Sequence, residues 1–135
     1  MPYPAKIQEF LDDLAMFPDR AERIDALISI GHRYKKPDGV PRTAETRVPG
    51  GESEVYVASV PEGEGRKFLF AVDNPQGISA MALAVVLDEG LSGEPPSEVG
   101  KVTEELVYEV FGRELSMGKS LGLTNLVRMV VSLGK

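Results

Sequence analysis

The 135-residue chain contains no cysteine, and its only histidine is His32. Without a thiol it can form no disulfide, offer no thiolate nucleophile or persulfide carrier, and ligate neither zinc nor an iron–sulfur cluster through cysteine. A single imidazole excludes a metal site built on several histidines. We therefore expect no metal centre and no resident cofactor.

Long apolar runs are also missing. No segment approaches the roughly 20 consecutive apolar residues that span a bilayer, and the N-terminal residues lack the basic and apolar regions of a signal peptide. The formal net charge of −6 disfavours binding to nucleic acid or to anionic membranes. We expect a cytoplasmic protein that binds neither.

The length and the 42% apolar content predict one domain over residues 1–135 with a packed core. Apolar residues three and four positions apart predict a helix over residues 4–16, and a second helix follows Asp19, with Glu22 at a capping-box spacing. A turn at Phe17-Pro18 makes the two helices an antiparallel hairpin. The buried face of the second helix is expected to hold Ile24, Leu27, Ile28 and Gly31.

Alternating residues predict a β-hairpin of residues 54–60 and 66–72 with Val55 and Val57 inward, and residues 46–48 suit a short edge strand. A long connection over 35–53 precedes it. Residues 78–88 form an apolar core helix, a helix follows around Leu106, and Ser116 caps a last helix from about Met117. The fold class is α+β: a small antiparallel sheet of about three strands covered by helices.

The residues that carry chemistry form no catalytic set. His32 suits the C-terminal end of its helix, where the dipole favours an imidazole. "GKS" at residues 118–120 lacks the spacing of a phosphate-binding loop. Five carboxylates can pair as acid and base or hold a hard metal ion, although a solvated acidic surface is the commoner explanation: Glu52, Glu54, Asp73, Asp88 and Glu89.

The stretch "RVPGGESEVYV" at residues 47–57 places a flexible loop before a strand. Pro49, Gly50 and Gly51 allow backbone conformations that other residues resist, and polar Glu52 and Ser53 follow. A loop of this kind often presents a reactive side chain at the start of a strand. Gly51, at its centre, has no side chain.

The order of these signals resembles the SufE family, the sulfur acceptors and activators of cysteine desulfurases in iron–sulfur cluster assembly. The resemblance begins in "ERIDALISIGHRY", centres on "VPGGESEVYV" and includes Asp73 ahead of the core helix. It ends in "LSMGKSLGLTNLVRMV", which is similar to the family's last motif. It implies a SufE/IscU-like fold, and as partners a SufS-like cysteine desulfurase and a cluster scaffold.

Two departures from the family pattern change what the resemblance implies. Gly51 occupies the position of the acceptor cysteine, and Lys119 replaces the usual arginine, which loses the bidentate fork. We expect a binding or modulating protein rather than an enzyme, with no catalytic residue and with Asp73 and Lys119 supporting the docking loop. That loop comprises Gly50, Gly51, Glu52 and Ser53. The alternative is a small-ligand-binding protein or enzyme with a pocket near Gly51, Asp73 and Lys119.

Overall fold

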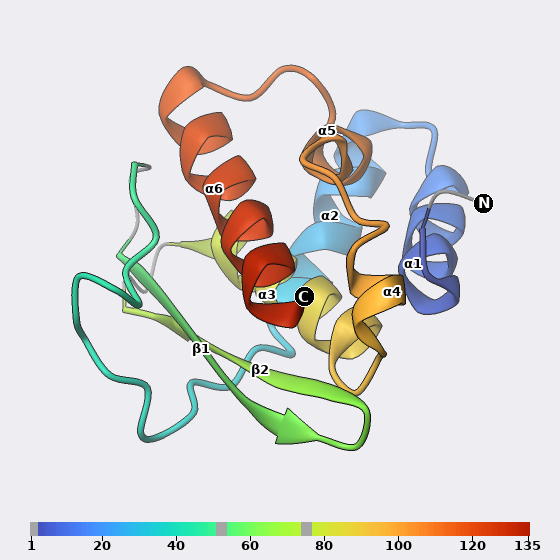
Figure 1. Cartoon of the computed structure of the whole chain (residues 1–135). Helices are drawn as coiled ribbons and strands as arrows, with labels where there is room; N and C mark the ends of the chain where they lie inside the picture. The colour runs from blue at the N-terminus through green and yellow to red at the C-terminus, as the bar shows by residue number, and fades with distance from the viewer. Residues whose placement is uncertain (1–2, 51–53, 74–76) are drawn as a thin grey trace.

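The computed structural model describes residues 3–50, 54–73 and 77–135. A two-stranded antiparallel hairpin lies against a group of helices (Figure 1). In chain order the elements are α1 (Ala5–Ala15), α2 (Arg20–Gly31), β1 (Val55–Glu62), β2 (Gly65–Val72), α3 (Ile78–Leu91), α4 (Pro96–Val99), α5 (Glu105–Phe111) and α6 (Met117–Gly134). The predicted α+β class is confirmed.

Helix α3 is the centre of the fold, because it contacts α1, α2, β2 and α6. Nine of its residues are buried and they face every direction around the helix, as the uninterrupted apolar sequence predicts. The helix continues to Leu91, three residues beyond the predicted end at residue 88. The short helix α4 was not predicted; Pro96 sits in its first turn, where a missing N–H costs nothing.

The first two helices form the predicted pair, and Asp19 caps α2 by accepting a hydrogen bond from the Ala21 N–H at 3.0 Å. The predicted buried face of α2 is wrong in part. Leu27 and Gly31 are buried, whereas Ile24 and Ile28 are 45% and 36% exposed. Helix α3 covers the side of α2 that carries Leu27 and Gly31, so the other half of the apolar stripe remains open.

The hairpin pairs Val55 with Val72 at one end and Glu62 with Gly65 at the other, so both strands extend beyond the predicted bounds towards the turn. Val55 and Val57 are buried as predicted. The predicted edge strand over residues 46–48 is reduced to one isolated bridge between Arg47 and Tyr56, which leaves a sheet of two strands. Proline, which has no N–H, follows at position 49 and ends the pairing.

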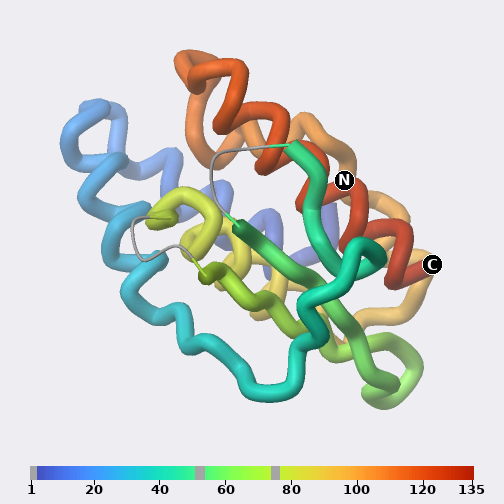
Figure 2. Tube along the Cα trace, turned by 90° about the vertical axis from the view of Figure 1, so that its left-hand side faces the viewer, coloured from blue at the N-terminus to red at the C-terminus, as the bar shows by residue number. Residues whose placement is uncertain are grey.

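The connection between α2 and β1 runs beside the hairpin and returns towards α6 (Figure 2). It contributes Val40 to a small second apolar cluster with Tyr56 and Ala71, which are register partners in the hairpin. The opposite face of the hairpin packs into the main core. No helix in the three described ranges is long and apolar enough to cross a membrane.

Candidate functional site

Helix α6 lies against the residues at which the predicted docking loop begins, Pro49 and Gly50. The side-chain amide of Asn125 donates a hydrogen bond to the Pro49 carbonyl at 2.8 Å. Gly50 has φ +72°, and a Cβ placed there would lie 2.8 Å from Leu121. The positive φ favours glycine at residue 50, and any larger residue there would also have to displace the Leu121 side chain. Gly51, Glu52 and Ser53 lie outside the described residues.

The chain enters β1 next to the end of β2. The Glu54 carbonyl accepts a hydrogen bond from the Asp73 N–H at 2.9 Å, and the Glu54 carboxylate lies 3.9 Å from the Arg47 guanidinium. The backbone of Arg47 in turn forms the isolated β-bridge with Tyr56. The residues on both sides of the loop are thus held in place. Pro49 and Gly50 contact α6, and Glu54 is bonded to Asp73, the residue that follows β2.

Asp73 is the centre of an ion-pair cluster. Arg42 binds its carboxylate through Nε and Nη2, each at 2.9 Å, and Lys36 lies 3.0 Å from Oδ1. The Arg42 guanidinium also stacks 5.3 Å from the centre of the Tyr56 ring. The hydrogen bonds from Arg42, and then from Lys36, lower the pKa of Asp73 from 3.8 to about 2. A carboxylate held ionised in this way positions neighbouring groups and is a weak general base.

Lys119 lies on the first turn of α6, where its N–H donates to the capping hydroxyl of Ser116 at 3.3 Å. Within the described ranges no ion pair joins Lys119 to Asp73; the partners of Asp73 come instead from the 35–53 connection. Lys119 lines a cavity with residues of α2 and α3, and Asp73 is not part of that lining. The alternative pocket near Gly51, Asp73 and Lys119 includes a residue outside the described ranges and stays a prediction.

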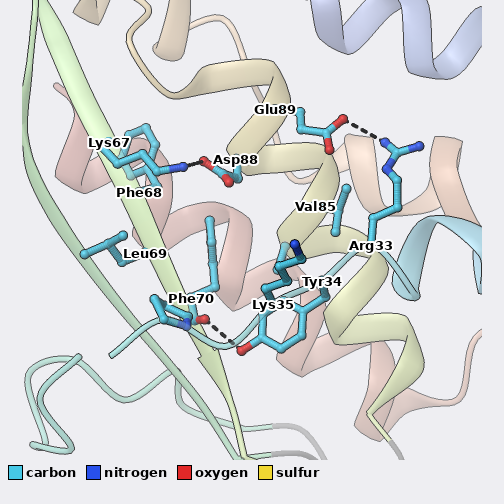
Figure 3. A pocket seen from close by; sticks show the side chains of 12 residues that line it. Arg33, Tyr34, Lys35, Lys67, Phe68, Leu69, Phe70, Val85, Asp88 and Glu89 are labelled. Carbon is cyan, nitrogen blue, oxygen red and sulfur yellow. Dashed lines mark hydrogen bonds and ion pairs between the residues drawn. The ribbon is translucent and has the colours of Figure 1, made fainter. Parts of the chain in front are cut away.

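A second cavity, of about 300 Å³, lies beside β2 (Figure 3). Asp88 at its margin pairs with Lys67 at 2.6 Å, and Glu89 pairs with Arg33 at 2.7 Å. Both carboxylates, considered above as acid–base or metal candidates, are thus matched by cations. Across residues 3–50, 54–73 and 77–135 no three His, Asp or Glu side chains are placed to hold a metal ion.

The sequence pattern did not identify the residues that fix the loop. Leu121 and Asn125 lie on α6, and the Asn125–Pro49 hydrogen bond spans 76 positions of the chain. The partners of Asp73 were only weakly indicated by the sequence. The stretch "KKPDGVPR" concentrates cations in a connection with few apolar residues. His32 ends α2, in the C-terminal position expected for it.

The fold and these attachments define a class: a small α+β domain whose last helix contacts the chain at Pro49 and Gly50, just before a β-hairpin begins. The comparisons with known proteins identify the class. The SufE model, described as an Fe-S metabolism associated domain, matches residues 8–133. The chain belongs to the SufE family, which confirms the resemblance found in the sequence.

Individual relatives agree with the family assignment. SufE-like protein 1, chloroplastic/mitochondrial, of Arabidopsis thaliana is 25% identical over 128 residues, which are 94% of this chain and 34% of that protein. The chain thus spans about a third of this relative. An uncharacterized SufE-like protein of Rhizobium meliloti (strain 1021) is 23% identical over 137 residues, covering 93% of this chain and 92% of that protein.

A solved structure shares the fold. The solution structure of a hypothetical protein from Thermus thermophilus matches with a TM-score of 0.75 and 21% sequence identity. The match covers 97% of this chain and 94% of the other. The arrangement of hairpin and helices is therefore one that a natural protein of the same size adopts.

Proposed function

We propose that this protein binds or modulates a cysteine desulfurase in iron–sulfur cluster assembly without carrying sulfur itself. The observation that carries the proposal is a SufE-family match over residues 8–133 in a chain that has no cysteine. Persulfide transfer requires a nucleophilic thiolate on the acceptor, and glycine at position 51 supplies none. The protein would then be a cytoplasmic binding module rather than an enzyme, with a cluster scaffold as a further partner.

The docking surface in this proposal is the loop of Gly50, Gly51, Glu52 and Ser53. Its attachments support that role: Asn125 and Leu121 hold one end, and the Asp73 N–H holds Glu54 at the other. Asp73, which directly follows β2, and Lys119 in α6 would support the loop. A loop fixed at both ends loses less conformational entropy on binding than a free one, which favours association.

Calorimetric titration with the organism's cysteine desulfurase tests the docking. We expect binding in the micromolar range. Glu52→Arg should weaken it by about tenfold, equivalent to about 1.4 kcal/mol, because it reverses a charge in the loop. Glu64→Arg is the matched control, since Glu64 lies in the hairpin turn at the opposite end of the strands. No binding at tens of micromolar would contradict the proposal, as would equal effects of the two variants.

A persulfide-transfer assay tests the absence of sulfur carriage. The desulfurase is supplied with cysteine labelled at sulfur, and the protein is analysed for bound label without reduction. We expect none on the natural protein and some on Gly51→Cys, because only the variant has a thiolate to receive the sulfane sulfur. Covalently bound sulfur on the natural protein would show that the thiol requirement is wrong.

A further inference from the structure

A groove of about 370 Å³ is lined by residues of α2, the start of α3 and the first turn of α6. Figure 1 shows where these three helices lie in the fold. Its volume lies within the range of natural small-molecule sites, about 300–1,000 Å³. The walls are largely apolar and come from three parts of the chain: Ile24, Leu27, Ile28, Ile78, Phe111 and Leu115. None of these residues belongs to the docking loop.

One wall of this groove is formed by the apolar residues of α2 that α3 leaves uncovered, Ile24 and Ile28. Ile24 and Ile28 keep 45% and 36% of their surface exposed, while Leu27 at the base is 8% exposed. Covering apolar surface gains about 25 cal/mol per Å² removed from water. An apolar occupant would therefore complete the burial that the spacing of α2 predicts.

The charges of the groove are opposite to those of the whole chain. The chain carries a net charge of −6, yet the groove is lined by three cations, Arg20, Arg23 and Lys119, and by one carboxylate, Glu114. Glu114 is paired with Arg20. Two positive charges remain without a matching carboxylate among the described residues, which favours an anionic occupant.

The two remaining cations differ in what they can offer. The Arg23 guanidinium already donates to backbone carbonyls, to Val110 at 3.2 Å and Leu14 at 3.4 Å, so its fork is occupied. The Lys119 ammonium has no carboxylate within 4.0 Å in the described part of the chain. One available ammonium beside an apolar wall matches the single charge of a carboxylate, whereas bidentate recognition of a phosphate would need a free guanidinium.

We propose that this groove binds a small amphiphilic carboxylate, a carboxylate head joined to a short aliphatic chain. Lys119 pairs with the head, Arg23 adds its positive charge, and the chain packs on Ile24, Ile28 and Ile78. The binding needs no desulfurase. The proposal therefore stands or falls separately from the proposed function.

Octanoate is the probe. Titration of the full chain, followed by calorimetry and by the methyl NMR signals of the isoleucines, should give a Kd on the order of 0.1–1 mM, as expected for a ligand of this size. The signals of Ile24, Ile28 and Ile78 should shift. Octanol and octyltrimethylammonium, which have the same chain with a neutral or positive head, should bind about fivefold more weakly or worse.

Lys119→Met tests the head-group contact, since it removes the charge and keeps an apolar side chain of similar length. It should weaken octanoate about five- to tenfold and leave octanol unchanged. Lys101→Met is the control, because Lys101 pairs with Glu98 on α4, outside the groove. Three results would overturn the proposal: no shift of the groove isoleucines at several times the expected Kd, equal affinity for the three head groups, or unchanged octanoate affinity in Lys119→Met.

Discussion

At the scale of single residues, Gly50 combines two constraints. Its φ of +72° is left-handed, and a Cβ would lie 2.8 Å from the Leu121 side chain. Gly50→Ala should lower the free energy of unfolding by about 1–2 kcal/mol from backbone strain, and further because Leu121 must move. Gly63→Ala, at φ +58° with nothing within 4 Å, should show the strain alone. Equal losses of the two variants in urea unfolding would contradict a contact with Leu121.

Asp73 should make stability depend on pH in the acid range. Its pKa is lowered from 3.8 to about 2 in the folded chain, so the ionised form favours folding. The contribution is fully present above the unfolded pKa near 3.8 and is lost as the pH falls through about 2. Asp73→Asn should lower the melting temperature by about 2–4 °C at neutral pH.

The comparison of natural protein and Asp73→Asn across pH is the measurement. The difference in melting temperature should stay constant from pH 7 to about pH 5 and then shrink towards pH 2. Glu64→Gln is a suitable control, because Glu64 lies in the exposed hairpin turn without an ion pair in the described part of the chain. A difference that grows on acidification would contradict the assigned role of Asp73.

At the scale of elements, Tyr34 joins the end of α2 to the outer edge of β2. Its hydroxyl donates to the Phe70 carbonyl and accepts from the Val72 N–H, both at 2.8 Å. Burial raises the pKa of Tyr34 above 10.0, which keeps the hydroxyl protonated as a donor. Tyr34→Phe leaves two strand groups unpaired and should cost about 1–3 kcal/mol.

Hydrogen exchange locates that effect. The Val72 amide should exchange faster in Tyr34→Phe. Tyr108→Phe is the matched control. Among the described residues the Tyr108 hydroxyl bonds the Ser120 hydroxyl alone, at 2.6 Å, and both are side-chain groups that can turn to water. The same unfolding free energy in the two variants, or unchanged exchange at Val72, would show that Tyr34 does not hold the strand edge.

Most elements could be predicted from local sequence, because apolar periodicity and caps act over a few residues. Asp19 and Ser116 cap the helices that they were expected to cap. The exposure of Ile24 and Ile28 could not be predicted in the same way. A periodic stripe shows which residues of a helix share a face, but only the arrangement of the other helices decides how much of that face is covered.

The candidate site could be predicted only in its location. Proline and glycine indicated the loop, and the family resemblance showed that Gly51 occupies the position of the acceptor cysteine. The residue of α6 that bonds the loop could not be predicted, because Asn125 reaches Pro49 only when α6 packs beside the hairpin. The partners of Asp73 were missed for a similar reason: Arg42 reaches it from a connection with no periodic pattern.

At the scale of the whole molecule, one apolar core connects the two ends of the chain. Buried residues from α1, α3 and α6, such as Ile7, Leu83 and Leu126, belong to the same cluster as the inward face of the hairpin. Gly90 of α3 lies so close to α1 that a Cβ there would collide with the Ile7 side chain. Loss of any helix would therefore expose residues of several others.

We predict from this shared core that residues 1–135 unfold as one cooperative unit. Calorimetry should show a single transition in which the calorimetric and van't Hoff enthalpies agree. For a chain of 135 residues the unfolding enthalpy should be about 95 kcal/mol near 60 °C. Far-UV circular dichroism follows the secondary structure, while near-UV signals from the four tyrosines follow the packing of side chains around the hairpin and the helices. Separate midpoints for the two signals would contradict the single cooperative unit, because secondary structure and side-chain packing would then be lost in different transitions.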